Sequence, residues 1–275
     1  MQVLSFVWDP SPGIDLGFFM IRYYSLMFVL AFSIGWFLTK RIFKNEGQSD
    51  DKMDSLFIYV VLATLIGARL GHVFFYQPEL LKDDFFSVFL PFSFKNGFEF
   101  TGFRGLASHG AAIGIIVAMY FYSKKVLKKP ILWILDRIVI AVASGAIFVR
   151  IGNFINSEII GKATNSDFGV VFKQLGEDFP RHPAQLYESF CYIFVFATLY
   201  YLYWKTNKSK QMGYLLGMFL VLLWTVRFFV EFVKEAQVDE RAEWALNTGQ
   251  WLSIPFIVIG AYLMISSPKR PVQNE

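Results

Sequence analysis

Seven apolar stretches, each roughly twenty residues long, limit what this chain can fold into more than any other feature of its sequence. A helix that crosses the hydrocarbon core of a bilayer, which is about 30 Å thick, needs roughly 20 mostly apolar residues. A membrane barrel would show shorter, alternating segments, and lipid cannot satisfy the edge of an open sheet. The sequence therefore predicts an all-α fold, a polytopic integral membrane protein with seven transmembrane helices in a single domain, residues 1–275. The approximate helix ranges are 18–39, 54–76, 104–123, 131–150, 184–204, 213–233 and 248–266.

The composition agrees with lipid as the solvent. Apolar residues make up 55% of the chain and charged residues 17%, against about 45–50% and 25% in soluble domains. The net charge is +4, but the basic residues fall in short clusters between apolar stretches, so nucleic acid is not an expected partner. Cys191 is the only cysteine, which excludes an intrachain disulfide.

The distribution of lysine and arginine predicts the orientation of the chain. These residues are most frequent in the short loops after the first, third and fifth stretches and in the C-terminal tail. Cytoplasmic loops of membrane proteins are enriched in lysine and arginine. We therefore expect the N-terminus outside, the C-terminus in the cytoplasm and residues 151–183 in an extracytoplasmic loop. The basic residues of the cytoplasmic side would be Lys40, Arg41, Lys44, Lys52, Lys124, Lys125, Lys128, Lys129, Lys205, Lys208, Lys210, Lys269 and Arg270.

Glycines four residues apart occur in three of the apolar stretches. Such pairs let the backbones of neighbouring helices approach closely, although the spacing also arises by chance in membrane helices. We take them as support for a compact bundle. The pairs are Gly67 with Gly71, Gly110 with Gly114, and Gly213 with Gly217.

The six basic residues that fall in or at the edges of the apolar stretches, outside the loops and the tail, are all arginines. A charged side chain at the membrane centre costs at least about 2.5–3.5 kcal/mol, so such residues usually face the interior of the bundle or a watery cavity. A guanidinium also binds a phosphate through two hydrogen bonds and stays charged in a partly dry site. The arginines concerned are Arg22, Arg69, Arg104, Arg137, Arg150 and Arg227.

Most polar residues of the helices would lie at one depth, near the outer leaflet, in the expected orientation. Asp136 and Arg137 are the exception, because they lie on the cytoplasmic side, where interactions with the interface or with neighbouring groups explain them. The convergence predicts a site for an anionic lipid head group, with acid–base chemistry from His109. The residues at this depth are Tyr24, Arg69, His72, His109, Arg150, Asn153, Gln185, Glu188, Arg227 and Glu231.

Structural interpretations of the same residues stay open. Arg227 and Glu231 are four residues apart and would form a buried ion pair. The side chains of Arg22 and Arg69 would extend to the outer membrane interface, which is the favoured interpretation for Arg22. His109 would form a hydrogen bond between helices. Two other classes of protein also fit: an anion or lipid transporter with an arginine-lined pathway, and an assembly protein whose polar groups hold helices together.

A polar run follows the fourth apolar stretch and carries several groups able to bind a ligand. It reads Arg150-Ile-Gly-Asn-Phe-Ile-Asn-Ser-Glu-Ile-Ile-Gly161. Its glycines interrupt regular helix, and Asn153, Asn156 and Glu158 can either cap the helix end or bind a polar head group. The run closely resembles the signature Arg-x-Gly-Asn-Phe-x-Asn-x-Glu-x-x-Gly of prolipoprotein diacylglyceryl transferases.

Further segments resemble motifs of this family, in the same order along nearly the whole chain. Three positions depart from the usual pattern: Val149 and Ala111 replace glycines beside the expected site, and Arg104 stands where glycine is common. These departures bear on the geometry of the site rather than on the class of protein. The matching segments are Tyr23-Tyr24-Ser25-Leu26-Met27, Gly67-Ala68-Arg69-Leu70-Gly71, Ser108-His109-Gly110, Arg181-His182-Pro183-Ala184-Gln185-Leu186-Tyr187-Glu188, Arg227-Phe228-Phe229-Val230-Glu231-Phe232 and Gly249-Gln250-Trp251-Leu252-Ser253.

The resemblance implies a multi-pass enzyme of the bacterial cytoplasmic (inner) membrane. It would transfer the diacylglyceryl group of phosphatidylglycerol to the lipobox cysteine thiol of a preprolipoprotein, forming a thioether and releasing glycerol phosphate. A free thiol has a pKa near 8.5, so a base is needed to form the thiolate. His109 is the candidate base, with Glu158 or Glu231 as alternatives, and Arg150 and Arg227 would stabilise the departing phosphate.

The expected partners are therefore phosphatidylglycerol, the signal peptide of a preprolipoprotein and membrane lipid. No metal and no cofactor are expected, because the histidines lie on different segments and no phosphate-binding glycine loop is present. The catalytic residues would be His109, Arg150 and Arg227. The substrate-binding residues would be Tyr24, Arg69, Asn153, Asn156, Glu158, Gly161, Glu188 and Glu231.

Overall fold

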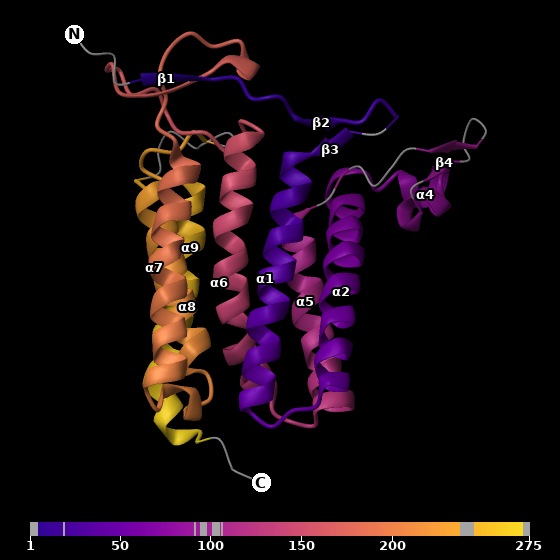
Figure 1. The fold of residues 1–275 in the computed structure, drawn as a ribbon, viewed down its shortest axis with the longest axis vertical. Helices are drawn as coiled ribbons and strands as arrows, with labels where there is room; N and C mark the ends of the chain where they lie inside the picture. Colours follow the sequence, from indigo (N-terminus) through magenta and orange to yellow (C-terminus); the bar gives the residue numbers. More distant parts are fainter. Residues whose placement is uncertain are drawn as a thin grey trace. The chain divides into compact units, whose positions relative to one another are not determined.

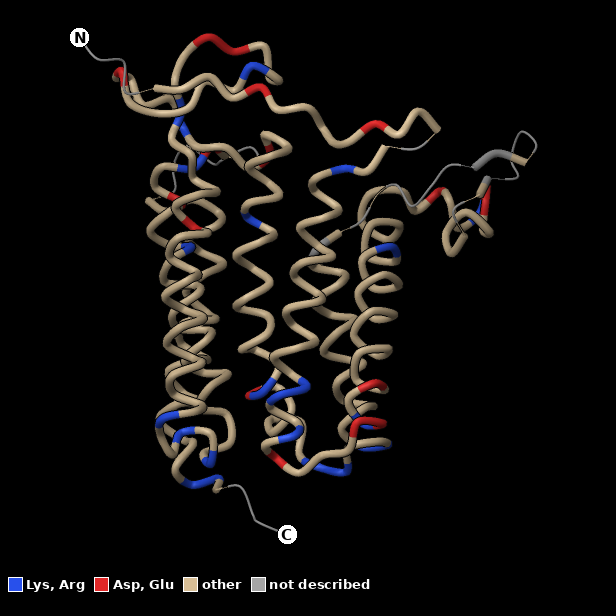
Figure 2. The backbone as a smooth tube through the Cα atoms, viewed as in Figure 1, with Lys and Arg blue, Asp and Glu red and all other residues tan. Residues whose placement is uncertain are grey.

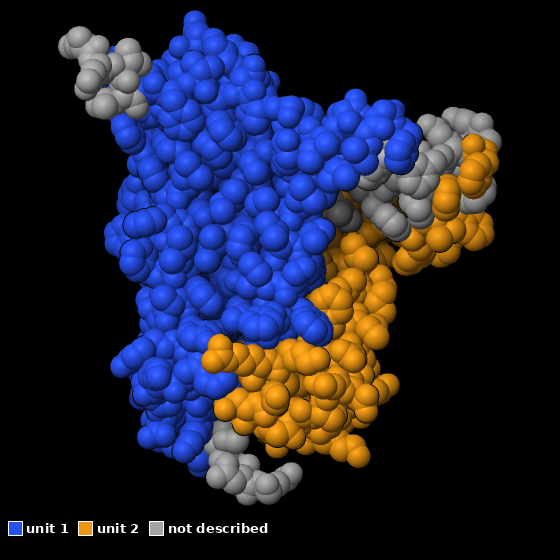
Figure 3. Space-filling view, in the orientation of Figure 1, with its two compact units in different colours: residues 1–39, 135–275 blue, residues 40–134 orange. Residues whose placement is uncertain are grey.

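The computed structural model describes residues 5–18, 20–90, 92–93, 98–100, 105, 107–236 and 245–271. Its backbone falls into two compact units, a first unit of residues 1–39 with 135–275 and a second unit of residues 40–134 (Figures 1 and 3). The single domain expected from the sequence stays a prediction.

The first unit is built mainly of long helices. It holds most of α1 (Tyr23–Asn45) and of α6 (Ile131–Ile155), together with α7 (Ala184–Lys205), α8 (Tyr214–Val230) and α9 (Thr248–Ser266). Helix α8 packs against both α7 and α9 (Figure 1). Short 3₁₀ turns lie in the connections and after α9, at Lys173–Leu175, Lys208–Lys210 and Ser267–Lys269.

The second unit is organised around α2 (Asp50–Tyr76) and α5 (Ser108–Tyr122), which pack against each other along their lengths. Helix α5 continues as a π-helical turn, Ser123–Leu127. The short helices α3 and α4 follow α2 and lie before α5. Their bounds are Leu80–Asp83 and Phe85–Phe89.

Short strands occur in the connections, which the all-α prediction did not include. Strand β1 (Ser5–Trp8) pairs in parallel with β6 (Gly169–Phe172), with Ser5 opposite Gly169. The other two pairs are antiparallel and even shorter: β2 (Gly13–Asp15) with β3 (Met20–Arg22), and β4 (Phe92–Ser93) with β5 (Glu99–Phe100). The described residues are nevertheless mostly helical.

Each of the seven predicted stretches contains a helix, and the differences are at the ends. The first helix begins at Tyr23 rather than at residue 18, because residues 20–22 pair as β3. Arg22 is therefore a strand residue. The third helix begins at Ser108, and Arg104, where we expected it to start, lies outside the described residues.

Among the described residues, five helices are long and apolar enough to cross a membrane. Helix α8 is apolar but has only 17 residues, which at about 1.5 Å per residue is shorter than the hydrocarbon core. Helix α7 is long enough to cross a membrane, but its tyrosines and Glu188 lower its mean hydropathy. The five helices are Tyr23–Asn45, Asp50–Tyr76, His109–Leu127, Ile131–Ile155 and Thr248–Lys269.

Charged residues at one end of the first unit hold the beginning of α8. Asp136 is fully buried on α6, and its carboxylate accepts hydrogen bonds from the backbone N–H groups of Gly213 (2.6 Å) and Leu216 (2.8 Å). Beside it, Arg137 donates to the backbone carbonyl of Ser209 at 3.1 Å. Interaction with neighbouring groups, as expected, therefore accounts for both. Lysines and arginines surround this end of α7, α8 and α9 (Figure 2).

Close approach of α2 and α5 depends on the glycines that the sequence shows at four-residue spacing. A Cβ atom on Gly71 would lie 2.6 Å from the Cα of Gly110, and one on Gly114 would lie 2.6 Å from the carbonyl oxygen of Ala63. Both obstacles are backbone atoms, which cannot rotate away. The glycines of this contact are therefore required by the distance between the two helices.

We expect Gly114→Ala to lower the free energy of unfolding by about 1–3 kcal/mol, the usual cost of overpacking a tight contact. Gly145→Ala on α6 is the matched control, because the nearest side-chain atom, the Cβ of Ala31, would lie at an ordinary 3.5 Å. Thermal unfolding of the detergent-solubilised protein measures both. Equal melting temperatures for the two variants would contradict the assigned contact.

Candidate functional site

The polar run 150–161 reverses the chain at the end of α6. The helix ends at Ile155, and the N–H of Glu158 donates to the carbonyl of Asn153 at 2.8 Å. Ser157 and Ile159 on either side of Glu158 have left-handed backbone conformations, with φ of 52° and 56°. Such angles are unfavourable for a β-branched residue and occur where surrounding contacts impose them. The reversal returns the Glu158 side chain to the helix that it has just left.

Hydrogen bonds then join four predicted residues of this run into one group. The carboxylate of Glu158 accepts from the amide of Asn153 at 3.2 Å and from the amide of Asn156 at 2.9 Å. The amide oxygen of Asn153 in turn accepts from Nη1 of Arg150 at 3.1 Å. Asn153 is buried. The chain Arg150–Asn153–Glu158 therefore fixes the direction of the arginine from one side.

A buried ion pair fixes Arg150 from the other side and joins α6 to α7. Its Nε lies 2.5 Å from Oε2 of Glu188, with side-chain exposures of 13% and 1%. The hydroxyl of Tyr192, one turn further along α7, is another partner of Arg150. Breaking a buried pair by removing one partner is strongly destabilising. Arg150 and Glu188 therefore act as a unit.

Two further side chains of α7 hold it against α6 beside this pair. Gln185 is fully buried and donates to the carbonyl of Glu158 at 2.6 Å. Ser189 donates to the carbonyl of Ile147 at 3.2 Å. These bonds align the first turns of α7 with the last turns of α6, which is the register that the ion pair needs.

A second charged group lies where α8 ends. Nζ of Lys234 lies 2.9 Å from Oε1 of Glu231, and Nε of Arg227 lies 3.7 Å from the same oxygen. Glu231 and Lys234 are buried, with 7% and 3% of their surfaces exposed. The predicted pairing of Arg227 with Glu231 is present, but Lys234 is the nearer partner of the carboxylate.

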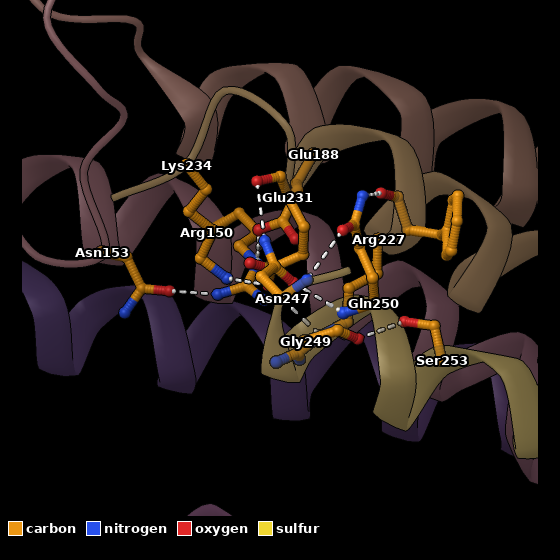
Figure 4. A network of polar contacts seen from close by, with 11 residues as sticks. Arg150, Asn153, Glu188, Arg227, Glu231, Lys234, Asn247, Gly249, Gln250 and Ser253 are labelled. Atoms are coloured by element: carbon orange, nitrogen blue, oxygen red, sulfur yellow. Dashed lines mark hydrogen bonds and ion pairs between the residues drawn. The ribbon is translucent and has the colours of Figure 1, made fainter. Parts of the chain in front are cut away.

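The first turn of α9 closes around Glu231. Asn247 and Gln250 cap this helix reciprocally, and Asn247 also donates to the carbonyl of Glu231 at 3.1 Å. A Cβ atom on Gly249 would lie 2.8 Å or less from both oxygens of the Glu231 carboxylate. Only glycine leaves this space, and a carboxylate is favoured at a helix N-terminus by the helix dipole. Figure 4 shows this network.

Tyr24 and Gly161 belong to the first unit through close packing. A Cβ atom on Gly152 would lie 2.9 Å from the Tyr24 ring, so this glycine lets the ring lie against α6. A Cβ atom on Gly161 would lie 2.9 Å from the carbonyl oxygen of Val233, and the N–H of Gly161 donates to the carbonyl of His182 at 3.1 Å. Gly161 therefore permits close approach of three backbone segments.

His109 and Arg69 belong to the second unit. His109 is exposed in the first turn of α5, and its Nε2 lies 3.5 Å from the hydroxyl of Tyr76. Arg69 is buried and donates to the carbonyls of Ser87 (2.7 Å) and Val88 (3.1 Å), which ties α4 to α2. A catalytic role for His109 and a substrate-binding role for Arg69 stay predictions.

Arg181 connects the loop before α7 to the segment after α8. It binds both oxygens of Glu177, at 2.6 and 2.7 Å, and one oxygen of Glu235 at 2.7 Å. These hydrogen bonds, those of Glu177 foremost, raise the pKa of the guanidinium above its ordinary value. Through these ion pairs, Arg181 stabilises the conformation of the loop around Gly161.

Sequence reasoning missed two members of the site. Lys234 is not among the predicted site residues, although its spacing of three from Glu231 would place both on one helical face. Asn247 was not considered, although an asparagine three residues before Gln250 and at the start of an apolar stretch has the spacing of a capping box. Both signals are local and could have been found.

The network offers cations and hydrogen-bond donors for an anion. Within the described residues, no group of three or more His, Cys, Asp or Glu side chains is arranged to hold a metal ion. Guanidinium groups bind phosphate oxygens bidentately. The charged members, contributed by α6, α7, α8 and the turn after α8, are Arg150, Glu188, Arg227, Glu231 and Lys234.

We expect Glu188→Gln to lower the free energy of unfolding by about 3–5 kcal/mol, because Arg150 would keep a buried charge without its partner. Glu235→Gln is the matched control: it breaks an ion pair of similar length whose carboxylate is 49% exposed, and should cost about 1 kcal/mol or less. Denaturation in mixed micelles measures both. A loss for Glu188→Gln no larger than that of the control would contradict the assigned burial.

Comparison with known proteins identifies the family. The family model described as prolipoprotein diacylglyceryl transferase matches residues 13–266. A phosphatidylglycerol–prolipoprotein diacylglyceryl transferase of Bacteroides fragilis is 40% identical over 98% of this chain and 97% of its own length. Proteins of the same name from Chloroherpeton thalassium and Tolumonas auensis are 40% and 38% identical, over 98% and 95% of this chain and 97% of each relative. The chain belongs to the prolipoprotein diacylglyceryl transferase family.

Proposed function

We propose that this membrane protein transfers the diacylglyceryl group of phosphatidylglycerol to prolipoproteins. The observation that carries the proposal is the likeness to transferases of that name over 98% of the chain, because the matched residues 13–266 include every member of the network. No observation favours the transporter or the assembly protein that the sequence also permitted.

The chemistry in finer detail is a substitution at carbon. The thiolate of the lipobox cysteine would attack the glyceryl carbon that carries the phosphate, so that a carbon–sulfur bond forms and a carbon–oxygen bond breaks. Glycerol phosphate leaves with the bonding electrons, and the thiol proton goes to a base. The reaction therefore needs a proton acceptor and a fixed positive charge beside the departing phosphate.

Arg150 and Arg227 are proposed as the groups that stabilise the departing phosphate. Arg150 is supported by its position, which Asn153 and Glu188 fix before any substrate binds. A cation held in place in this way needs no reorganisation as charge develops. Tyr24, Asn156 and Gly161 are proposed to shape the binding site around it.

His109 is the proposed base. The alternatives are less suited, because Lys234 lies 2.9 Å from the carboxylate of Glu231 and two amide N–H groups bind the carboxylate of Glu158. Each of these carboxylates is therefore already bound by donors of the protein itself. The imidazole of His109 is exposed, and its Nε2 lies 3.5 Å from the hydroxyl of Tyr76.

The proposed topology has seven transmembrane helices, an outer N-terminus and a cytoplasmic C-terminus, in the inner membrane of a bacterium. Helices α7 and α8 would add to the five helices that are long and apolar enough alone. The packing of α8 against both α7 and α9 supports this. The basic residues around the α7–α8 connection and after α9 support a cytoplasmic location of that end.

The decisive experiment uses purified protein in detergent with phosphatidylglycerol and a lipobox peptide that contains cysteine. We expect a diacylglyceryl-modified peptide, detected by mass spectrometry, together with free glycerol phosphate. A peptide with serine in place of the cysteine is the control and should stay unmodified. Absence of product from well-folded protein would overturn the proposal.

We expect His109→Gln to slow transfer by about 100-fold or more, the usual contribution of a general base, and to leave the affinity for phosphatidylglycerol nearly unchanged. Transfer rates at several pH values and lipid binding to the same preparation measure the two effects. Wild-type rates across the pH range would exclude His109 as the base.

A further inference from the structure

Two cations compete for one oxygen at the end of α8. Lys234 Nζ lies 2.9 Å from Oε1 of Glu231, which is hydrogen-bonding distance, whereas Arg227 Nε lies 3.7 Å from it, which is not. The hydrogen bond between Lys234 and Glu231 is buried. The carboxylate is therefore held by the lysine rather than by the arginine on its own helix.

Arg227 binds the carboxylate of Glu231 less closely than Lys234 does. Its Nε is buried and makes no hydrogen bond with the described residues, although its side chain as a whole is 26% exposed. The guanidinium carbon lies 5.3 Å from the centre of the Trp224 ring, and that ring stacks on Phe256 at 4.2 Å. An aromatic face attracts a cation without occupying its N–H donors.

The charge balance differs between the two arginines. Arg150 faces Glu188 one to one. Arg227 and Lys234 share the single carboxylate of Glu231, which leaves one positive charge in excess. A phosphodiester carries one negative charge, and a guanidinium binds it in a bidentate manner. The excess charge and the free donor coincide on Arg227.

The backbone around Lys234 is set by the end of the polar run. Residues 233–235 pair with residues 160–162: the N–H of Lys162 donates to the carbonyl of Val233 at 2.8 Å, and the N–H of Glu235 donates to that of Ile160 at 3.0 Å. The absence of a side chain at Gly161 permits this approach. Lys234 is therefore held beside Glu231 by a second segment and not only by α8.

We propose that Lys234 is a positioning residue, which binds Glu231 and so leaves Arg227 available to the phosphate of the lipid substrate. The proposal rests on the proposed transferase function. Lys234 acts through the carboxylate and does not itself contact the lipid. Without its ammonium group, Glu231 would turn to Arg227, four residues away on the same helix face, and compete with the phosphate.

The test is a double-mutant cycle of Lys234→Met and Glu231→Gln, because methionine has a similar length and no charge. Affinity for short-chain phosphatidylglycerol is measured by titration calorimetry, and KM and kcat are measured with the same lipid. We expect Lys234→Met alone to weaken binding and raise KM about tenfold, with a smaller change in kcat. In the Glu231→Gln background the same substitution should change affinity less than about twofold, since no carboxylate remains to compete.

Two further variants keep the result interpretable. Lys234→Arg should restore wild-type affinity. Lys162→Met is the matched control, because the ammonium group of this neighbouring lysine donates to a backbone carbonyl, that of Phe232, rather than to a carboxylate. The affinity and KM of this variant should stay within about twofold of wild type. Equal effects of Lys234→Met in both backgrounds, or wild-type affinity in the single variant, would overturn the positioning role. Lipid binding by wild type without transfer would instead overturn the proposed function, and the binding cycle would still decide the role of Lys234.

Discussion

Each buried charge of the first unit needs an oppositely charged partner, and this requirement fixes how the helices of the unit pack. An isolated charge in a low-dielectric interior costs several kcal/mol, so the arginine of α6 depends on the glutamate of α7. Sliding α7 by one residue would turn Glu188 by about 100° around the helix and break its 2.5 Å contact with Arg150. Gln185 and Ser189 reinforce the same alignment through backbone carbonyls of the α6 region.

The same pairing would prepare the unit for the proposed anionic substrate. Every cation of the network is already oriented by protein groups: Arg150 by an amide and a carboxylate, Arg227 by an aromatic ring, and Lys234 by Glu231. Such orientation is made during folding, so the free energy of reorganisation is not required when a substrate develops charge. The glycines at positions 152, 161 and 249 bring the backbone close enough for these contacts.

Hydropathy was sufficient to predict a helix in each of the seven apolar stretches, because a long apolar segment in lipid forms a helix that satisfies its own backbone hydrogen bonds. Charge spacing suggested the pair of Arg227 and Glu231, but it could not rank Lys234 above Arg227. That ranking depends on how the chain turns after Val230 and on pairing with residues 160–162, which are distant in sequence. The expected depth of Arg69 in the membrane could not show that its side chain binds backbone carbonyls of the α4 region. In a helix that is apolar on all sides, the order of the residues does not show which face contacts a neighbouring helix.

The pairing of β1 with β6 has a consequence for the time course of synthesis. Ser5 lies opposite Gly169, and Trp8 donates to the carbonyl of Phe154 at 3.0 Å. The N-terminal strand emerges first, yet its partner strand is made only after 164 further residues, the separation of Ser5 and Gly169. At about 5–20 residues per second, β1 waits roughly 8–30 s without its partner. The β1–β6 pair beside the end of α6 can therefore form only after the helices α1 to α6 have been synthesised.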